Sequence, residues 1–86
     1  MTFSEVLSKL KSEEKCMAFR SGWNGKGMFL FLVPNWTFTN GWMDNAPCIP
    51  FICMKTADDK FVPWLASQTD ILAEDWNYTS PEGPKP

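Results

Sequence analysis

Met28-Phe29-Leu30-Phe31-Leu32-Val33 is the longest apolar run of the chain, and it decides the fold. A short run that is apolar on both faces is typical of a strand that is covered on both sides. We therefore expect residues 28–33 to form a strand at the centre of a sheet or against a partner subunit. The Pro34-Asn35 pair ends this strand, because proline cannot donate a backbone hydrogen bond to a neighbouring strand.

Further strands are expected on both sides of this run. Residues 16–19 read as a short strand, and residues 51–55 and 61–64 read as a hairpin around a polar turn. Pro63 assigns the second hairpin strand to a sheet edge or a bulge. Residues 35–50 look like a long irregular connection. We expect this connection to pack or to bind something, because a structureless loop of this length with so many aromatic residues is unusual.

Both ends of the chain carry helix signals. A capping box at Thr2 to Glu5, followed by apolar residues at helical spacing, predicts a helix that ends near Glu13 or Glu14. Near the other end, residues 67–70 can cap a short helical turn at residues 71–74. Residues 75–78 then read as a last strand.

These elements predict an α+β fold, in which an N-terminal helix packs on a small antiparallel β-sheet and a short C-terminal helical turn precedes a last strand. The chain of 86 residues is long enough for one domain, which we place at residues 1–78. Residues 79–86 are rich in proline and are expected to form a disordered tail.

The composition favours self-association and excludes several classes of function. The chain has five Trp, seven Phe and one Tyr, which is more large rings than one short domain can bury alone. We assign Trp36, Trp42 and Trp76 to packing or to a subunit interface. A net charge of −2 and a pI of about 4.9 argue against binding of DNA or RNA polymers. The run at residues 28–33 is too short to cross a bilayer, so no membrane role is expected.

Two segments carry the residue types of a ligand site. The first segment, residues 20–28, and the second segment, residues 62–70, each place a tryptophan beside small polar residues and a few charges. An indole can stack on a purine, and backbone N–H groups of a glycine-rich turn can bind a phosphate. These segments predict a binder of a flat, phosphate-bearing molecule. Two alternatives remain open: Asn24-Gly25 only turns a hairpin beside a core Trp23, and residues 67–70 only cap a helix.

Nothing in the sequence predicts catalysis, a metal site or a cofactor. The chain has no histidine, which removes the commonest general base and the commonest metal ligand. Asp70 and Glu74 are spaced for one helical face and could hold Mg²⁺, but the acidic residues of this region are expected to be mostly solvated. The three cysteines read as reduced thiols of a cytosolic protein, with a disulfide between Cys48 and Cys53 as the alternative.

A family resemblance adds to this interpretation. The pattern Arg-x-Gly-Trp-Asn-Gly-Lys-x-Met occurs at Arg20–Met28, Lys-Thr-Ala-Asp occurs at Lys55–Asp58, and Val-Pro-Trp-x-x-Ser-Gln-Thr-Asp-x-Leu-Ala-Glu-Asp-Trp occurs at Val62–Trp76. With the capped N-terminal helix, the likeness covers residues 2–76. The chain resembles the second Thoeris anti-defence family, small proteins of bacteriophages and prophages.

The resemblance implies a function as a sponge. Such a protein binds a cyclic ADP-ribose-type messenger made by a bacterial TIR-domain defence enzyme, does not cleave it, and so keeps the downstream effector inactive. It implies homotetramers with ligand pockets at subunit interfaces, action in the cytoplasm of the infected host, and in some members binding of cyclic oligonucleotides.

The expected ligand-binding residues come from both segments. We expect Trp23 to stack on a base, the glycine-turn amides and Thr69 to bind phosphate or ribose, and Asp70 to bind a base amine or a ribose hydroxyl. The full expected set is Arg20, Trp23, Asn24, Gly25, Lys26, Trp64, Ser67, Gln68, Thr69 and Asp70.

Two other hypotheses are retained. The chain is a structural or interaction accessory protein of a phage, with aromatic residues that only make subunit contacts and with no nucleotide ligand. Alternatively, it is a hydrolase of the same messengers, which the missing histidine disfavours.

Overall fold

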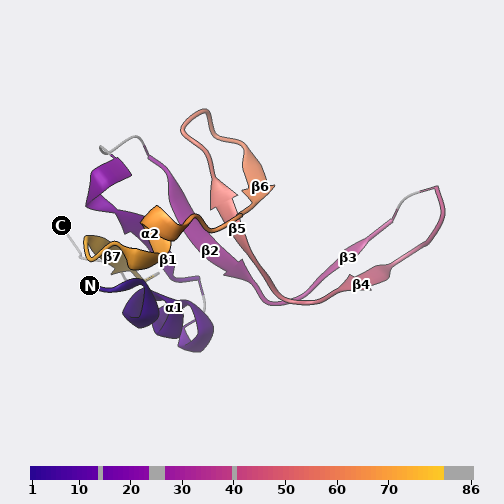
Figure 1. Cartoon of the computed structure of the whole chain (residues 1–86). Helices are drawn as coiled ribbons and strands as arrows, with labels where there is room; N and C mark the ends of the chain where they lie inside the picture. The colour runs from indigo at the N-terminus through magenta and orange to yellow at the C-terminus, as the bar shows by residue number, and fades with distance from the viewer. Residues whose placement is uncertain (14, 24–26, 40, 81–86) are drawn as a thin grey trace.

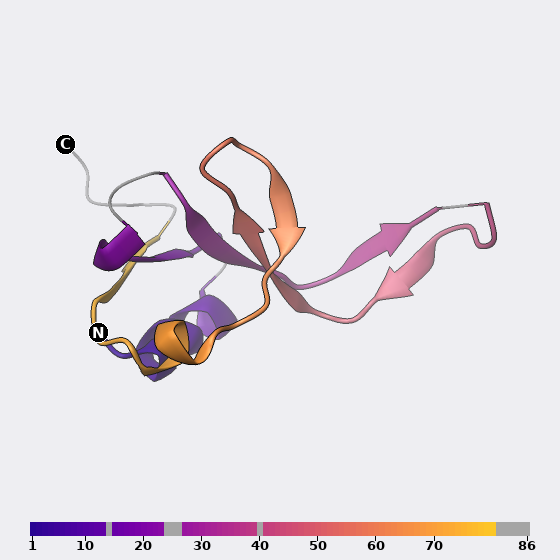
Figure 2. The ribbon, with the colours of Figure 1, turned by 45° about the horizontal axis from the view of Figure 1, so that its top comes forward.

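The computed structural model describes residues 1–13, 15–23, 27–39 and 41–80. A five-stranded antiparallel sheet forms its body, in the order β6-β5-β2-β1-β7. Helices α1 and α2 lie on one side of this sheet, and a two-stranded arm of β3 and β4 extends away from it (Figure 1, Figure 2). The predicted α+β class and the N-terminal helix on an antiparallel sheet are confirmed.

The element bounds follow the sequence signals closely. The helices are α1 (Phe3–Ser12) and α2 (Gln68–Leu72), and a 3₁₀ turn, η1, occupies Ser21–Trp23. The strands of the body are β1 (Met17–Arg20), β2 (Phe29–Val33), β5 (Phe51–Lys55), β6 (Phe61–Pro63) and β7 (Trp76–Thr79), and those of the arm are β3 (Trp36–Phe38) and β4 (Ala46–Cys48). α2 begins at Gln68, directly after its cap, rather than at the expected residue 71. β7 includes Thr79, and residues 81–86 of the expected tail lie outside the described residues.

The capping box and the central strand form as predicted. The Thr2 side chain accepts a hydrogen bond from the Glu5 N–H, and the Glu5 carboxylate accepts one from the Thr2 N–H. β2 lies at the middle of the sheet, between β5 and β1. β6 is an edge strand, which is where Pro63 can be accommodated.

The core lies between α1 and one face of the sheet. Its buried members are Val6, Leu10, Cys16, Ala18, Leu30 and Trp76. The central strand alternates, so Leu30 faces this core while Phe29 and Phe31 face the other side. Ring contacts support this assignment, since the centroid of the Phe31 ring lies 6.0 Å from that of Phe29 and 5.7 Å from that of Phe61 on the edge strand β6. We call the side away from α1 the open face.

The interpretation of residues 35–50 as an irregular connection is corrected, because Trp36–Phe38 and Ala46–Cys48 form strands. β3 and β4 pair antiparallel, with Trp36 opposite Cys48 and Phe38 opposite Ala46. They continue the ladder in which Val33 of β2 pairs with Phe51 of β5. Pro47 lies within β4, and a proline in a short run reads as a loop signal when only the sequence is considered.

The arm leaves its aromatic residues exposed. Trp36 is 58% exposed and Trp42 is 92% exposed, whereas Trp76 is fully buried. The radius of gyration is 14.1 Å, larger than the roughly 12 Å typical of a compact domain of this length. The radius of gyration is larger because of the arm, which extends to the right in Figure 1.

Candidate functional site

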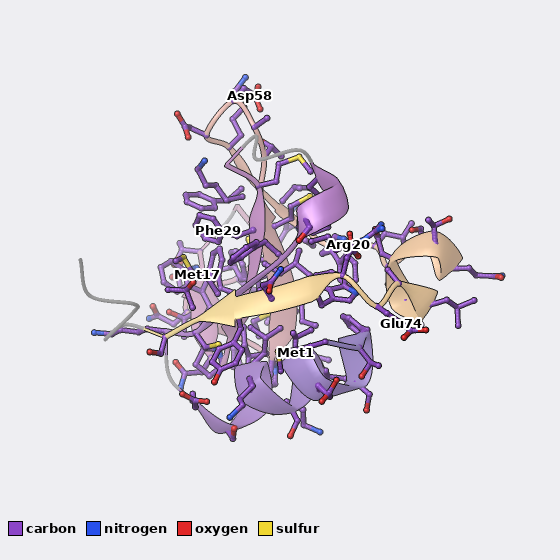
Figure 3. All side chains as sticks on the ribbon, turned by 90° about the vertical axis from the view of Figure 1, so that its left-hand side faces the viewer. Met1, Met17, Arg20, Phe29, Asp58 and Glu74 are labelled. Carbon is purple, nitrogen blue, oxygen red and sulfur yellow. The ribbon has the colours of Figure 1, made fainter. Side chains whose placement is uncertain are left out.

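Arg20 joins the two predicted segments through a pair of carboxylates. At the end of β1, its Nη1 lies 2.7 Å from Asp70 Oδ1, and its Nε lies 2.8 Å from Asp75 Oδ1. The Arg20 and Asp70 side chains are only 18% and 17% exposed, so these ion pairs are partly shielded from water. Figure 3 shows Arg20 beside the part of the chain that contains α2 and Glu74. The two segments therefore meet at Arg20 and Asp70.

These contacts correct one expectation about the acidic residues. Asp58 and Asp59 are mostly exposed, at 67% and 81%, as expected for solvated carboxylates. Asp70 and Asp75 instead lie against the same guanidinium. Hydrogen bonds to both carboxylates raise the pKa of Arg20, and the bond to Asp75 has a larger effect than the bond to Asp70. Conversely, Arg20 holds the pKa of Asp75 below its ordinary value, with a further contribution from the Gly22 N–H.

The η1 turn is fastened to the start of β7. The Ser21 N–H donates to the Asp75 carbonyl at 3.0 Å, and the Gly22 N–H donates to Asp75 Oδ2 at 2.6 Å. The Asn77 side-chain amide donates to Ser21 Oγ at 3.1 Å. This turn carries Trp23 and leads directly into the predicted glycine turn.

Trp23 and Trp64 both pack on the buried Trp76. The ring centroids are 5.3 Å apart for Trp23 and Trp76, and 6.2 Å apart for Trp64 and Trp76, with nearly perpendicular planes. Edge-to-face contacts of this kind stabilise an aromatic cluster beyond the burial of its area. The Trp76 indole N–H also donates to the Asp70 carbonyl at 2.8 Å. Trp23 and Trp64 are half-buried, so each combines a core contact with an accessible part.

The second segment also acts as a helix cap. Ser67 Oγ accepts a hydrogen bond from the Asp70 N–H at 3.1 Å, so the predicted capping role of Ser67 is confirmed. Gln68 and Thr69 follow in the first turn of α2, and both are exposed. Their side chains are therefore accessible to a ligand beside the Arg20–Asp70 ion pair.

The structure describes seven of the ten expected ligand residues. It brings Arg20 and Asp70 into contact, joins Trp23 and Trp64 through Trp76, and places Ser67, Gln68 and Thr69 at the start of α2. Asn24, Gly25 and Lys26 lie outside the described residues. Sequence reasoning missed Asp75 as a partner of Arg20, although Asp75 belongs to the Ala-Glu-Asp-Trp part of the family pattern.

The structure places the residues that were considered for a metal site or a disulfide. Within residues 1–13, 15–23, 27–39 and 41–80, no three histidine, cysteine or carboxylate groups are grouped as metal ligands would be. Asp70, one of the two residues considered for Mg²⁺, is paired with Arg20. Cys16, Cys48 and Cys53 are free thiols rather than a disulfide, and burial raises the pKa of the Cys16 thiol.

Surface hollows occur at other places on the protomer. One of about 510 Å³ lies beside the end of α1, with Lys11, Lys15 and Phe31 among its lining residues. Another of about 360 Å³ has an almost wholly apolar lining on the open face and the base of the arm, including Phe31, Trp36 and Phe61. Neither is lined by Trp23, Trp64 or Asp70. In the described part of the chain, no helix is both long and apolar enough to cross a membrane.

Comparison with known proteins places the chain in a family. The sequence profile of the Thoeris anti-defense 2-like domain matches residues 1–78, which contain both segments and the strand that fastens them. The protein named Thoeris anti-defense 2 from Bacillus phage SP01 is 45% identical to this chain over 87 aligned positions, covering 93% of this chain and 96% of the relative. The chain therefore belongs to the Thoeris anti-defense 2-like family, and its role is in Thoeris anti-defence.

Proposed function

We propose that this chain binds a cyclic ADP-ribose-type messenger and holds it intact, so that the Thoeris effector receives no signal. The observation that carries the proposal is the meeting of the two segments, in which the Arg20–Asp70 ion pair lies beside two half-buried tryptophans that share the Trp76 core. Membership of the anti-defence family supports the biological side of the proposal.

The chemistry of these residues suits a nucleotide. The accessible parts of Trp23 and Trp64 provide apolar faces for an adenine base, a contact worth roughly 1–3 kcal/mol. The exposed Gln68 and Thr69 side chains supply donors and acceptors for ribose or phosphate. Asn24, Gly25 and Lys26 complete the set in our proposal, with backbone N–H groups and one ammonium for the phosphates. One stacked base and four or five charge-assisted hydrogen bonds are enough for affinity of about nanomolar strength in a preformed pocket.

The proposed activity is retention rather than cleavage. Hydrolysis of a glycosidic or phosphate bond needs a general base or a metal-bound water near the scissile atom. The sequence has no histidine, the Asp70 and Asp75 carboxylates are both paired with Arg20, and the Asp75 carboxylate also accepts from the Gly22 N–H. The Arg20 guanidinium and the Gly22 N–H hold the pKa of Asp75 below its ordinary value, which makes this carboxylate a weak base.

We further propose that the protein acts as a homo-oligomer, a homotetramer by family resemblance, in the cytoplasm of the infected host. The open face supports self-association, because it exposes an apolar hollow of about 360 Å³ that continues onto the arm. Exposed apolar surface of this kind marks an interaction site. An assembly would also bring the pockets of neighbouring protomers together, as the resemblance implies.

Calorimetry with cyclic ADP-ribose isomers, each tested in turn, examines the proposal directly. We expect tight binding by the wild-type protein and loss of binding in Trp23→Ala, with Lys60→Ala, in the polar turn before β6, as a control that binds normally. Heating the complex and analysing the released molecule by mass spectrometry should return the unchanged messenger. Failure to bind any cyclic ADP-ribose isomer or cyclic oligonucleotide would remove the proposal, and a chemically altered product would replace it with a hydrolase.

The exposed arm and open face favour one second candidate, a phage accessory protein that only makes protein contacts. In that case Trp23→Ala should lower the stability of folding with no ligand effect to explain. Capture of a stoichiometric protein partner by the wild-type chain, together with no nucleotide binding, would support this candidate.

A further inference from the structure

Among the described residues, Asp75 accepts more hydrogen bonds from the first segment than Asp70, the expected ligand residue that is paired with Arg20. One carboxylate oxygen, Oδ1, accepts from Arg20 Nε at 2.8 Å, and the other, Oδ2, accepts from the Gly22 N–H at 2.6 Å. The Asp75 carbonyl accepts from the Ser21 N–H at 3.0 Å. Three successive residues of the first segment are thus bonded to a single residue at the start of β7.

Gly22 fits closely against this carboxylate. A Cβ atom at position 22 would lie 2.9 Å from Asp75 Oδ2 and 3.1 Å from Arg20 Nη2. Real Cβ atoms do not approach oxygen that closely, so any side chain at this position has to displace the carboxylate or the guanidinium. The glycine is needed here for close approach of the backbone, and not for a special backbone angle.

Asp75 itself is held in place by the core. The next residue, Trp76, is fully buried, and its indole N–H is fixed on the Asp70 carbonyl. Asp75 therefore directly precedes a strand whose first residue is fixed in the core, whereas η1 is a single 3₁₀ turn that precedes the predicted glycine turn. The hydrogen bonds from Arg20, Ser21 and Gly22 to Asp75 therefore fix the position of η1 relative to β7.

We propose that Asp75 is a positioning residue of the messenger site, which binds no ligand itself but sets the placement of η1 and of the Trp23 indole. This inference rests on the proposed function, since it assigns Asp75 a role in the same site. It explains why one carboxylate receives two donors from residues on either side of Ser21, because two anchors fix both the position and the direction of the turn.

The variant Asp75→Asn tests the hydrogen bonds of the carboxylate, because asparagine has nearly the same size and shape as aspartate. An asparagine side chain has one acceptor oxygen and one NH₂ donor, so it can satisfy either Arg20 Nε or the Gly22 N–H, but not both. Loss of a charge-assisted hydrogen bond at an anchor should weaken messenger binding by about 10- to 100-fold. Glu74→Gln is the matched control, because it makes the same charge change at the neighbouring residue, whose exposed side chain makes no hydrogen bond or ion pair with the described residues.

The experiment combines calorimetry with NMR of the full chain. We expect Asp75→Asn to bind a cyclic ADP-ribose isomer about 10- to 100-fold more weakly than wild type. We expect its Gly22 amide and Trp23 indole resonances to shift in the ligand-free protein, while Glu74→Gln matches wild type in both. Gly22→Ala, which crowds the carboxylate from the other side, should weaken binding to a similar degree and shift the Trp23 indole resonance if Asp75→Asn folds poorly.

Two outcomes would overturn the inference. One is an affinity of Asp75→Asn within about twofold of wild type. The other is a loss of affinity with unmoved Gly22 and Trp23 resonances, which would indicate a general loss of stability. If the wild-type protein binds no messenger, the proposed function fails, and the NMR comparison alone still decides whether Asp75 sets the turn: unmoved resonances reject it and selective shifts support it.

Discussion

Replacement of Trp76 by phenylalanine tests whether this residue unites the two segments. Trp76 is fully buried, contacts the rings of Phe3, Trp23 and Trp64, and donates its indole N–H to the Asp70 carbonyl at 2.8 Å. Phenylalanine keeps one aromatic ring but cannot donate this hydrogen bond. The substitution therefore removes the polar link to the second segment and part of the ring packing at the same time.

The expected cost can be worked out from these contacts. The Ala73 N–H also donates to the Asp70 carbonyl, at 3.3 Å, so the carbonyl keeps one partner and the loss is that of one hydrogen bond, about 0.5–1.5 kcal/mol. The missing ring atoms leave a void worth about 1–2 kcal/mol. Trp76→Phe should thus lower the free energy of unfolding by about 1.5–3.5 kcal/mol, a large share of the total stability of a domain of this size.

Urea denaturation followed by far-UV circular dichroism measures this cost without depending on indole fluorescence. Protein concentration is held fixed, because self-association would add to the apparent stability. Lys60→Ala is the control, since the Lys60 side chain is 79% exposed and its replacement should change stability by less than about 0.5 kcal/mol. A Trp76→Phe variant as stable as the Lys60→Ala control would refute the assignment of Trp76 as the centre of the core.

Three further predictions concern the anchors around this core. Gly22→Ala should lower the stability by about 1–3 kcal/mol through displacement of Asp75 or Arg20, whereas Gly41→Ala, with open space around it, should have little effect in the same urea titration. Because the folded-state pKa of Asp75 lies below its ordinary 3.8, the stability from its ion pair is present above that pH and is lost as the pH falls further. The difference in unfolding free energy between wild type and Asp75→Asn should therefore shrink on acidification, and a constant difference would contradict the ion pair. Thr2→Ala, which removes the capping box of α1, should cost about 0.5–2 kcal/mol and lower the helical signal in thermal melts.

Local sequence patterns were sufficient to predict most of the fold. The capping box at Thr2, the apolar run of β2 and the polar turn before β6 each involve residues that are close in sequence, so their signals survive without knowledge of the partner. The arm could not be found in this way. Its strands form because Trp36 and Cys48 extend a ladder that begins between β2 and β5, and pairing of that kind is a long-range property.

The same distinction applies to the candidate site. The indoles and the cap at Ser67 are readable from residue type and spacing, and the structure places both segments around Trp76. The partners of Arg20 are not readable, because Asp70 and Asp75 are 50 and 55 residues away along the chain. From the sequence alone, Arg20 could be a cation available to a ligand or a partner in an internal ion pair. The pairing of β1 with β7 brings Arg20 close to Asp75 and shows that it forms internal ion pairs.

A single protomer covers only one face of its sheet. One sheet face is covered by α1, whereas the open face and the arm expose rings from β2, β3 and β6 around an apolar hollow of about 360 Å³. A domain this short gains limited stability from its own core, so covering the open face is a substantial further source of stability. If another copy covers it, folding and assembly are linked by mass action, and the unfolding midpoint rises with protein concentration. A midpoint that is independent of concentration would show that the open face stays uncovered and that one protomer supplies the whole site.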